Sequence, residues 1–86
     1  MENDAILKTL ILCYVTPKTG YYMSLEYLEE FNKFILIGSD LDTLDDIAYF
    51  LEIKSKKVYI FENIDQLISG PEATILNDLN THLTIV

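Results

Sequence analysis

Short apolar runs rich in β-branched and aromatic residues alternate along this chain with segments that carry helix-start signals. Residues 6–15, 57–61 and 83–86 have the composition of strands. Residues 34–37 are also apolar, but four residues do not distinguish a buried strand from the last turn of a helix. Strands that alternate with helices are typical of α/β folds. We therefore predict a small, mainly parallel sheet covered by helices.

Turn and capping residues place the first expected helix. Residues 16–20 contain a proline, which presets φ, and a glycine, which tolerates a positive φ, so a turn is expected there. Residues 21–23 then either return as a short strand or lead directly into a helix. Ser24 is expected to cap this helix, whose apolar positions include Phe31.

Three further helical segments are expected in the second half of the chain. Ser39 or Asp40 is expected to cap a helix that runs to about residue 53. Asn63 is placed to cap a short helical turn. Pro71 suits the first turn of a last helix, which is expected to reach about residue 79.

Charge and composition limit the partners of this chain. Its 86 residues include 14 acidic side chains against six lysines and no arginine, which gives a formal net charge of −8. Half of the residues are hydrophobic, so a single folded domain over residues 1–86 is expected rather than disorder. So negative a charge argues against direct binding to nucleic acid or anionic lipid. It favours a basic protein as the partner.

Other features of the sequence bear on cofactors and location. The single cysteine, Cys13, excludes an internal disulfide and a cysteine-based zinc site, and it is expected to be buried as a small hydrophobe. Residues 1–4 are acidic, where a secretory signal needs a basic region. The longest apolar run is too short to span a bilayer. We therefore expect a cytoplasmic protein without a cofactor.

The most informative segment is residues 38–49, because it holds four of the seven aspartates of the chain. Each residue of a helix advances about 100° around its axis. One side of the expected helix therefore carries apolar side chains that face the core: Leu41, Leu44, Ile47, Ala48 and Leu51. The opposite side carries three carboxylates and one aromatic ring: Asp42, Asp45, Asp46 and Tyr49.

Two interpretations of this acidic side stay open. In the first it is a solvated helix face, where the helix dipole favours aspartate near the N-terminus; this explains Asp40 and Asp42. It explains Asp45 and Asp46 less well, since aspartate is a poor helix former beyond the first turn and like charges four residues apart repel. In the second it is a docking surface whose repulsion a cationic partner relieves. A metal site is disfavoured, because the spacing of a calcium loop is missing and the carboxylates diverge around the helix.

The start of this helix resembles the signature of the barstar family, small acidic inhibitors of ribonucleases. The family carries Tyr-x-Gly-x-Asn-Leu-Asp-Ala-Leu, and residues 36–44 here are Leu-Ile-Gly-Ser-Asp-Leu-Asp-Thr-Leu. A Val-Tyr-Ile-Phe-Glu run at residues 58–62, a Gly-x-Glu helix start at residue 70 and a final Leu-Thr-Ile-Val run follow in the family's order. The resemblance covers roughly residues 24–86.

This resemblance implies a fold, a function and a set of contact residues. The fold is a three-stranded parallel sheet packed by three to four helices. The function is that of an immunity protein, not an enzyme, which neutralises a toxin by inserting its acidic second helix into a cationic nuclease site, and which is a monomer when free. The residues expected to bind the partner are Leu36, Gly38, Asp40, Leu41, Asp42, Asp45, Asp46 and Tyr49. Asp46 takes the place of the family's key inhibitory aspartate, and Asp78 is the nearest counterpart of its acidic contact on the last helix.

The sequence also bears on functions of other classes. An acidic phage- or mobile-element-type inhibitor of a nucleic-acid-binding protein stays open, and so does a self-associating scaffold domain. An acyl carrier modified at Ser39 is disfavoured, because carriers are all-helical. Catalysis has little support, since His82 has no neighbouring nucleophile and is expected near a helix end. Tyr14 and Tyr59 are expected to be structural residues of strands.

Overall fold

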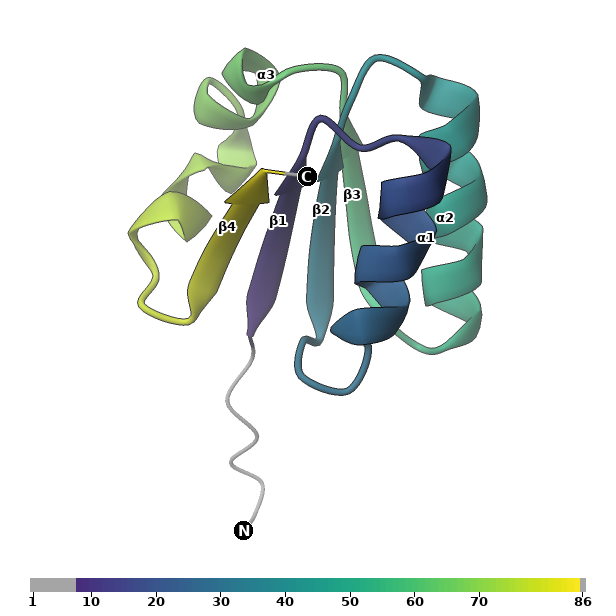
Figure 1. The fold of residues 1–86 in the computed structure, drawn as a ribbon. Coiled ribbons are helices and arrows are strands. Elements are labelled where there is room, and N and C mark those ends of the chain that lie inside the picture. Colours follow the sequence, from purple (N-terminus) through teal and green to yellow (C-terminus); the bar gives the residue numbers. More distant parts are fainter. Residues whose placement is uncertain (1–7, 86) are drawn as a thin grey trace, which may run out of the picture.

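A parallel β-sheet forms the centre of the computed structural model, which describes residues 8–85 (Figure 1). Its strands in this range are β1 (Thr9–Cys13), β2 (Lys33–Ile37), β3 (Lys57–Phe61) and β4 (Thr81–Ile85). They lie in the order β3-β2-β1-β4, and each neighbouring pair is parallel. The predicted α/β class and parallel sheet are confirmed. The number of strands is wrong, because residues 8–85 contribute four strands where the family resemblance implied three.

The additional strand is β2, the apolar run that the sequence left undecided. β2 pairs with β1 on one side and with β3 on the other. Its side chains are buried on both faces of the sheet: Phe34 and Leu36 pack on one side and Ile35 and Ile37 on the other. A central parallel strand is therefore a continuous apolar run with no alternation, which is why its pattern resembles that of a buried helical turn.

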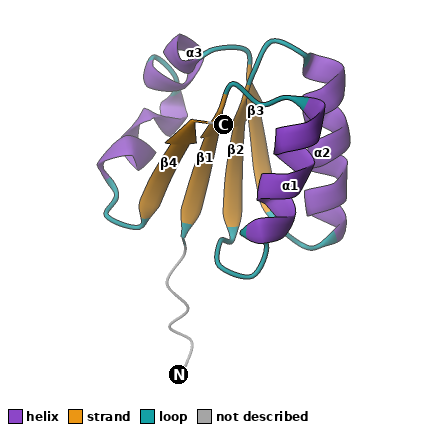
Figure 2. Cartoon of the chain, in the orientation of Figure 1, coloured by secondary structure: helices purple, strands orange, loops and turns teal. Residues whose placement is uncertain are grey.

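Helices cover the two faces of the sheet. α1 (Pro17–Glu26) and α2 (Leu41–Ile53) lie on one face, and α3 (Ile64–Ile68) and the 3₁₀-helix η1 (Pro71–Asn77) lie on the other (Figure 2). The sheet is thus the middle layer of three. On the α1–α2 side the buried residues are Leu10, Leu12, Val15, Phe31, Phe34, Leu36, Leu44, Ile47, Ala48 and Leu51. On the other side they are Ile11, Cys13, Ile35, Ile37 and Leu67.

α1 begins earlier than the sequence predicted. Thr16 is its N-cap: the Thr16 hydroxyl accepts a hydrogen bond from the Thr19 backbone N–H at 3.3 Å, and Pro17 opens the first turn. The predicted turn at residues 16–20 and the predicted cap at Ser24 are therefore wrong, since Gly20 and Ser24 are both buried within α1. Phe31 lies beyond the helix, in the buried approach to β2.

Two buried positions of α1 are expected to respond in opposite directions to alanine. A Cβ on Gly20 would collide with Ile47 Cδ1 and lie 2.6 Å from Val15 Cγ1. Overpacking of about 1–3 kcal/mol should outweigh the ~1 kcal/mol that alanine gains over glycine in a helix, so Gly20→Ala should lower the free energy of unfolding. Ser24→Ala should raise it by about 1 kcal/mol, because the buried Ser24 hydroxyl has no partner among the described residues. Urea unfolding of both variants measures this, and the same sign for both would contradict the packing described here.

Three other segments differ from their predictions. The last expected helix is the 3₁₀-helix η1, which ends at Asn77. His82 lies within β4, edge-on to the Phe31 ring at 5.4 Å between centroids, and not at a helix end. Tyr14 follows β1 with a φ of 60° and is 70% exposed, so it is not a buried strand residue. The predicted strand ends at residues 6–7 and 86 lie outside the described range.

Candidate functional site

The acidic side of α2 forms an exposed surface on the helix layer that covers one face of the sheet. Asp42, Asp45, Asp46 and Tyr49 are all exposed, and Tyr49 retains 69% of its accessible area. Their spacing of three and four residues places them on one side of the helix. The opposite side is anchored by four buried residues, as predicted: Leu44, Ile47, Ala48 and Leu51. We call the four exposed residues, together with Asp40, the acidic face.

The first turn of α2 is held by Asp40, which confirms one of the two predicted caps. The Asp40 carboxylate accepts hydrogen bonds from the Thr43 hydroxyl at 2.8 Å and from the Thr43 backbone N–H at 3.2 Å. These two bonds, the hydroxyl first, lower the pKa of the Asp40 carboxyl from its ordinary value. Asp40 therefore orders the helix start while keeping its charge on the acidic face.

Removing this cap should destabilise the protein at neutral pH and have little effect in acid. The pKa of Asp40 is lower in the folded than in the unfolded chain, so its stabilising effect is present above the unfolded value of about 3.9 and is lost as the pH falls through the folded value. We expect Asp40→Ala to have a lower melting temperature than the wild type at pH 7, and the difference to shrink below pH 4. Melting curves at both pH values test this. A difference that does not change with pH would show that the charge on Asp40 is not what stabilises the turn.

The structure separates the eight residues predicted to bind a partner into an exposed and a buried group. Leu36 is fully buried beneath α1 and α2, and Gly38 is buried where a Cβ would lie 3.2 Å from the Val15 carbonyl oxygen. Neither residue can contact a partner directly, so neither belongs to the candidate binding surface. Leu41, expected to face the core, is 43% exposed, because it opens α2 at the edge of the sheet. Leu41 thus lies beside the acidic face.

The acidic face lacks counter-charges within the described part of the chain. Among residues 8–85 the ion pairs join Lys8 to Glu30 and Lys33 to Glu72, each at 3.9 Å, and neither involves α2. The nearest lysine along the chain, Lys54, has its ammonium over the Phe50 ring at 5.9 Å. The negative potential of α2 is therefore directed to solvent. Asp78 follows η1 on the other face of the sheet, so it does not extend this surface.

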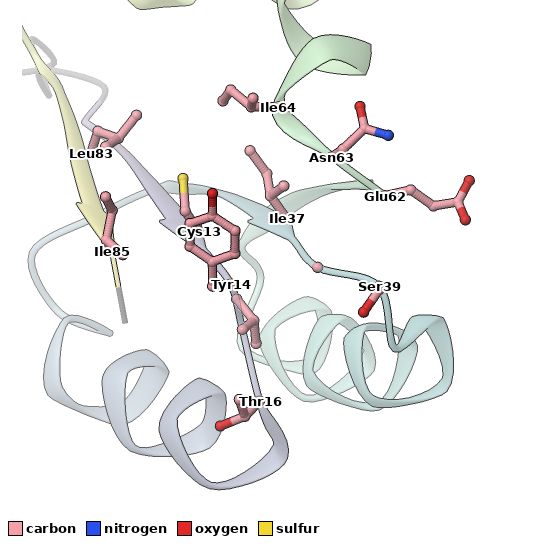
Figure 3. Close-up of a pocket in the computed structure, with 12 residues that line it drawn as sticks. Cys13, Tyr14, Thr16, Ile37, Ser39, Glu62, Asn63, Ile64, Leu83 and Ile85 are labelled. Carbon is pink, nitrogen blue, oxygen red and sulfur yellow. The ribbon is translucent and has the colours of Figure 1, made fainter.

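A second feature, which the sequence analysis missed, is a cavity at the carboxyl ends of the strands (Figure 3). It has a volume of about 540 Å³ and is lined by residues that follow or end β1, β2, β3 and β4. Tyr14 lies at this cavity. Tyr14 has a positive φ, which is uncommon for residues other than glycine. The neighbouring residues contain no pattern that predicts this backbone conformation. Knowledge of the strand order would have been needed to find the cavity.

No group of three or more potential metal-binding side chains lies together within residues 8–85. No helix in that range has the length and apolar character needed to cross a membrane. Comparison of the chain with protein-family models, with curated proteins and with solved structures finds no match.

Proposed function

We propose that this chain is a non-catalytic inhibitor that covers a basic site on another protein with the acidic face of α2. The observation that carries the proposal is that Asp42, Asp45 and Asp46 project together from an anchored helix, with no lysine of residues 8–85 in an ion pair with them. Packing like charges on one helix side costs a few tenths of a kcal/mol per pair. A cationic partner turns this cost into attraction.

The partner that best fits such a face is a nuclease, in the role of a toxin that this protein neutralises in the cytoplasm. Nuclease sites hold phosphates with arginine, lysine and histidine, and carboxylates on a rigid helix present the same charge to these groups. A net charge of −8 also accelerates the encounter with a basic protein, in a manner that salt weakens. The resemblance of residues 36–44 to the barstar signature supports a ribonuclease in particular. The proposal depends on the α2 face and not on the family, whose implied sheet has one strand fewer.

The decisive experiment uses the protein encoded beside this chain's gene. We expect that protein to cleave RNA, and this chain to inhibit the cleavage at a one-to-one ratio in a complex that weakens as salt rises. Inhibition of nucleic-acid binding by a non-cleaving partner would instead favour a masking inhibitor of the phage or mobile-element type. A homo-oligomer that buries the acidic face would overturn both and leave a scaffold function.

A further inference from the structure

The cavity lies where the direction of the strand order reverses. From β1 the chain passes through α1 to β2 and through α2 to β3, on one face of the sheet (Figure 1). It then returns through α3 and η1 on the other face to place β4 on the free side of β1. In open parallel sheets the connections diverge at such a reversal and leave a crevice at the carboxyl ends of the strands, which is where ligands bind. The volume of about 540 Å³ falls in the range of small-molecule sites.

The lining of the cavity is mostly apolar. β4 contributes Leu83 and Ile85, β1 contributes Cys13, β2 contributes Ile37 and α3 contributes Ile64 (Figure 3). Leu83 is 51% exposed although it lies in β4. The aliphatic side chains among these offer dispersion and burial to a guest but no hydrogen bond, and the Cys13 thiol is only a weak donor.

Tyr14 is one of the uncharged polar side chains at this mostly apolar surface, together with Thr16, Ser39 and Asn63. Its φ of 60° is costly for a residue with a large side chain, and such strain is found at sites where it positions a functional group. In Figure 3 the Tyr14 ring stands among the side chains that line the cavity. A hydroxyl in this place can donate or accept one hydrogen bond from a guest.

The charge around the cavity selects against anions. Glu62 is the charged residue among those that line it, and its carboxylate points outward at the rim (Figure 3). No lysine contributes to the lining within residues 8–85. With a net charge of −8 as well, an acidic guest would meet repulsion and no partner. A phosphate-bearing ligand, the usual guest of a parallel sheet, is therefore disfavoured.

We propose that this crevice binds a small uncharged molecule that is mostly apolar and carries one polar group, with indole as its representative: the apolar part packs on Ile37, Ile64 and Leu83, and the polar group bonds to the Tyr14 hydroxyl. None of the five residues of the acidic face lines the cavity, so the site does not depend on the inhibitor function. Failure of one proposal leaves the other standing.

Indole is the probe, since the chain contains no tryptophan and the fluorescence of indole can be followed alone. We expect a saturable blue shift of indole emission on titration with the full chain. Leu83→Glu should weaken binding by roughly tenfold or more, because it places a carboxylate against the ring. The control is Leu25→Glu, a leucine 60% exposed on α1 and absent from the lining, which should change affinity less than about twofold.

A second variant keeps the test decisive if Leu83→Glu fails to fold. Tyr14→Phe retains the ring and removes the hydroxyl. It should weaken binding of indole several-fold and leave binding of 1-methylindole, which has no N–H to donate, unchanged. Equal losses for both probes would overturn the assigned hydrogen bond.

Cys13 gives an independent readout, because it lines the cavity and is the only cysteine of the chain. Burial raises the pKa of its thiol, so reaction with the uncharged reagent 4,4′-dithiodipyridine should be slow. Saturating indole should slow it further in the wild type and not in Leu83→Glu. No blue shift, or a reaction rate that indole does not change, would overturn the proposal.

Discussion

Asp42→Asn combined with Asp46→Asn is expected to abolish binding of the partner while leaving the fold intact. Losing one member of a desolvated charge pair costs about 2–5 kcal/mol, so the double variant should bind on the order of a thousandfold more weakly. Both side chains are exposed and neither forms an ion pair within residues 8–85. The free energy of unfolding should therefore stay within about 0.5 kcal/mol of the wild type, or rise as repulsion is relieved. Calorimetric titration with the partner and urea unfolding measure the two effects.

The matched control removes the same amount of charge elsewhere. Glu26→Gln combined with Glu29→Gln changes two exposed carboxylates at the end of α1 and beyond it. We expect this control to slow association slightly, because it lowers the long-range attraction, and to leave dissociation unchanged. If the control weakens binding as much as the α2 variant, general charge rather than the acidic face drives the interaction. If the α2 variant unfolds, its aspartates are structural.

Leu36→Ala and Leu41→Ala are expected to separate core from surface at two leucines that were both predicted to bind the partner, one of which is buried and the other exposed. Leu36 is fully buried in the central strand β2, so its truncation should cost about 2–5 kcal/mol of unfolding free energy. That is a large part of the 5–15 kcal/mol typical of a whole domain. Leu41 is 43% exposed at the start of α2, and its truncation should cost less than about 1 kcal/mol. Urea unfolding of the two variants measures the difference.

The same pair tests the edge of the binding surface. Leu41→Ala should weaken partner binding, because Leu41 lies beside the acidic face, while Leu36→Ala should alter binding only through lost stability. Nearly equal unfolding free energies for the two variants would mean that Leu36 is not packed as described. Undiminished binding by Leu41→Ala would limit the surface to the carboxylates and Tyr49.

Features that depend on neighbours within one or two turns were predictable. The caps at Asp40 and Asn63 were found because a capping side chain bonds to a backbone N–H three residues later. The buried side of α2 was found for Leu44 through Leu51 because helical period alone places those residues on one arc. The error at Leu41 has a tertiary cause, since its angle on the helix is that of a core residue but the packed layer does not extend to the first turn.

Features that depend on contacts between distant segments were not predictable from local patterns. Gly20 suggested a turn, yet it lies inside α1, where its missing side chain makes room for Ile47 of α2. The run at residues 34–37 became a strand because β1 and β3 both pair with it.

The sequence by itself determined the class of fold, the negative charge and the two-sided character of α2, because these features depend only on residue types and on their spacing along the chain. Only the tertiary structure decided that a fourth strand completes the described sheet, that Leu36 is buried and Leu41 exposed, and that a crevice opens beside Tyr14. These three features depend on the order in which the strands pair. That order is set by the total apolar area that segments far apart in the chain bury against one another.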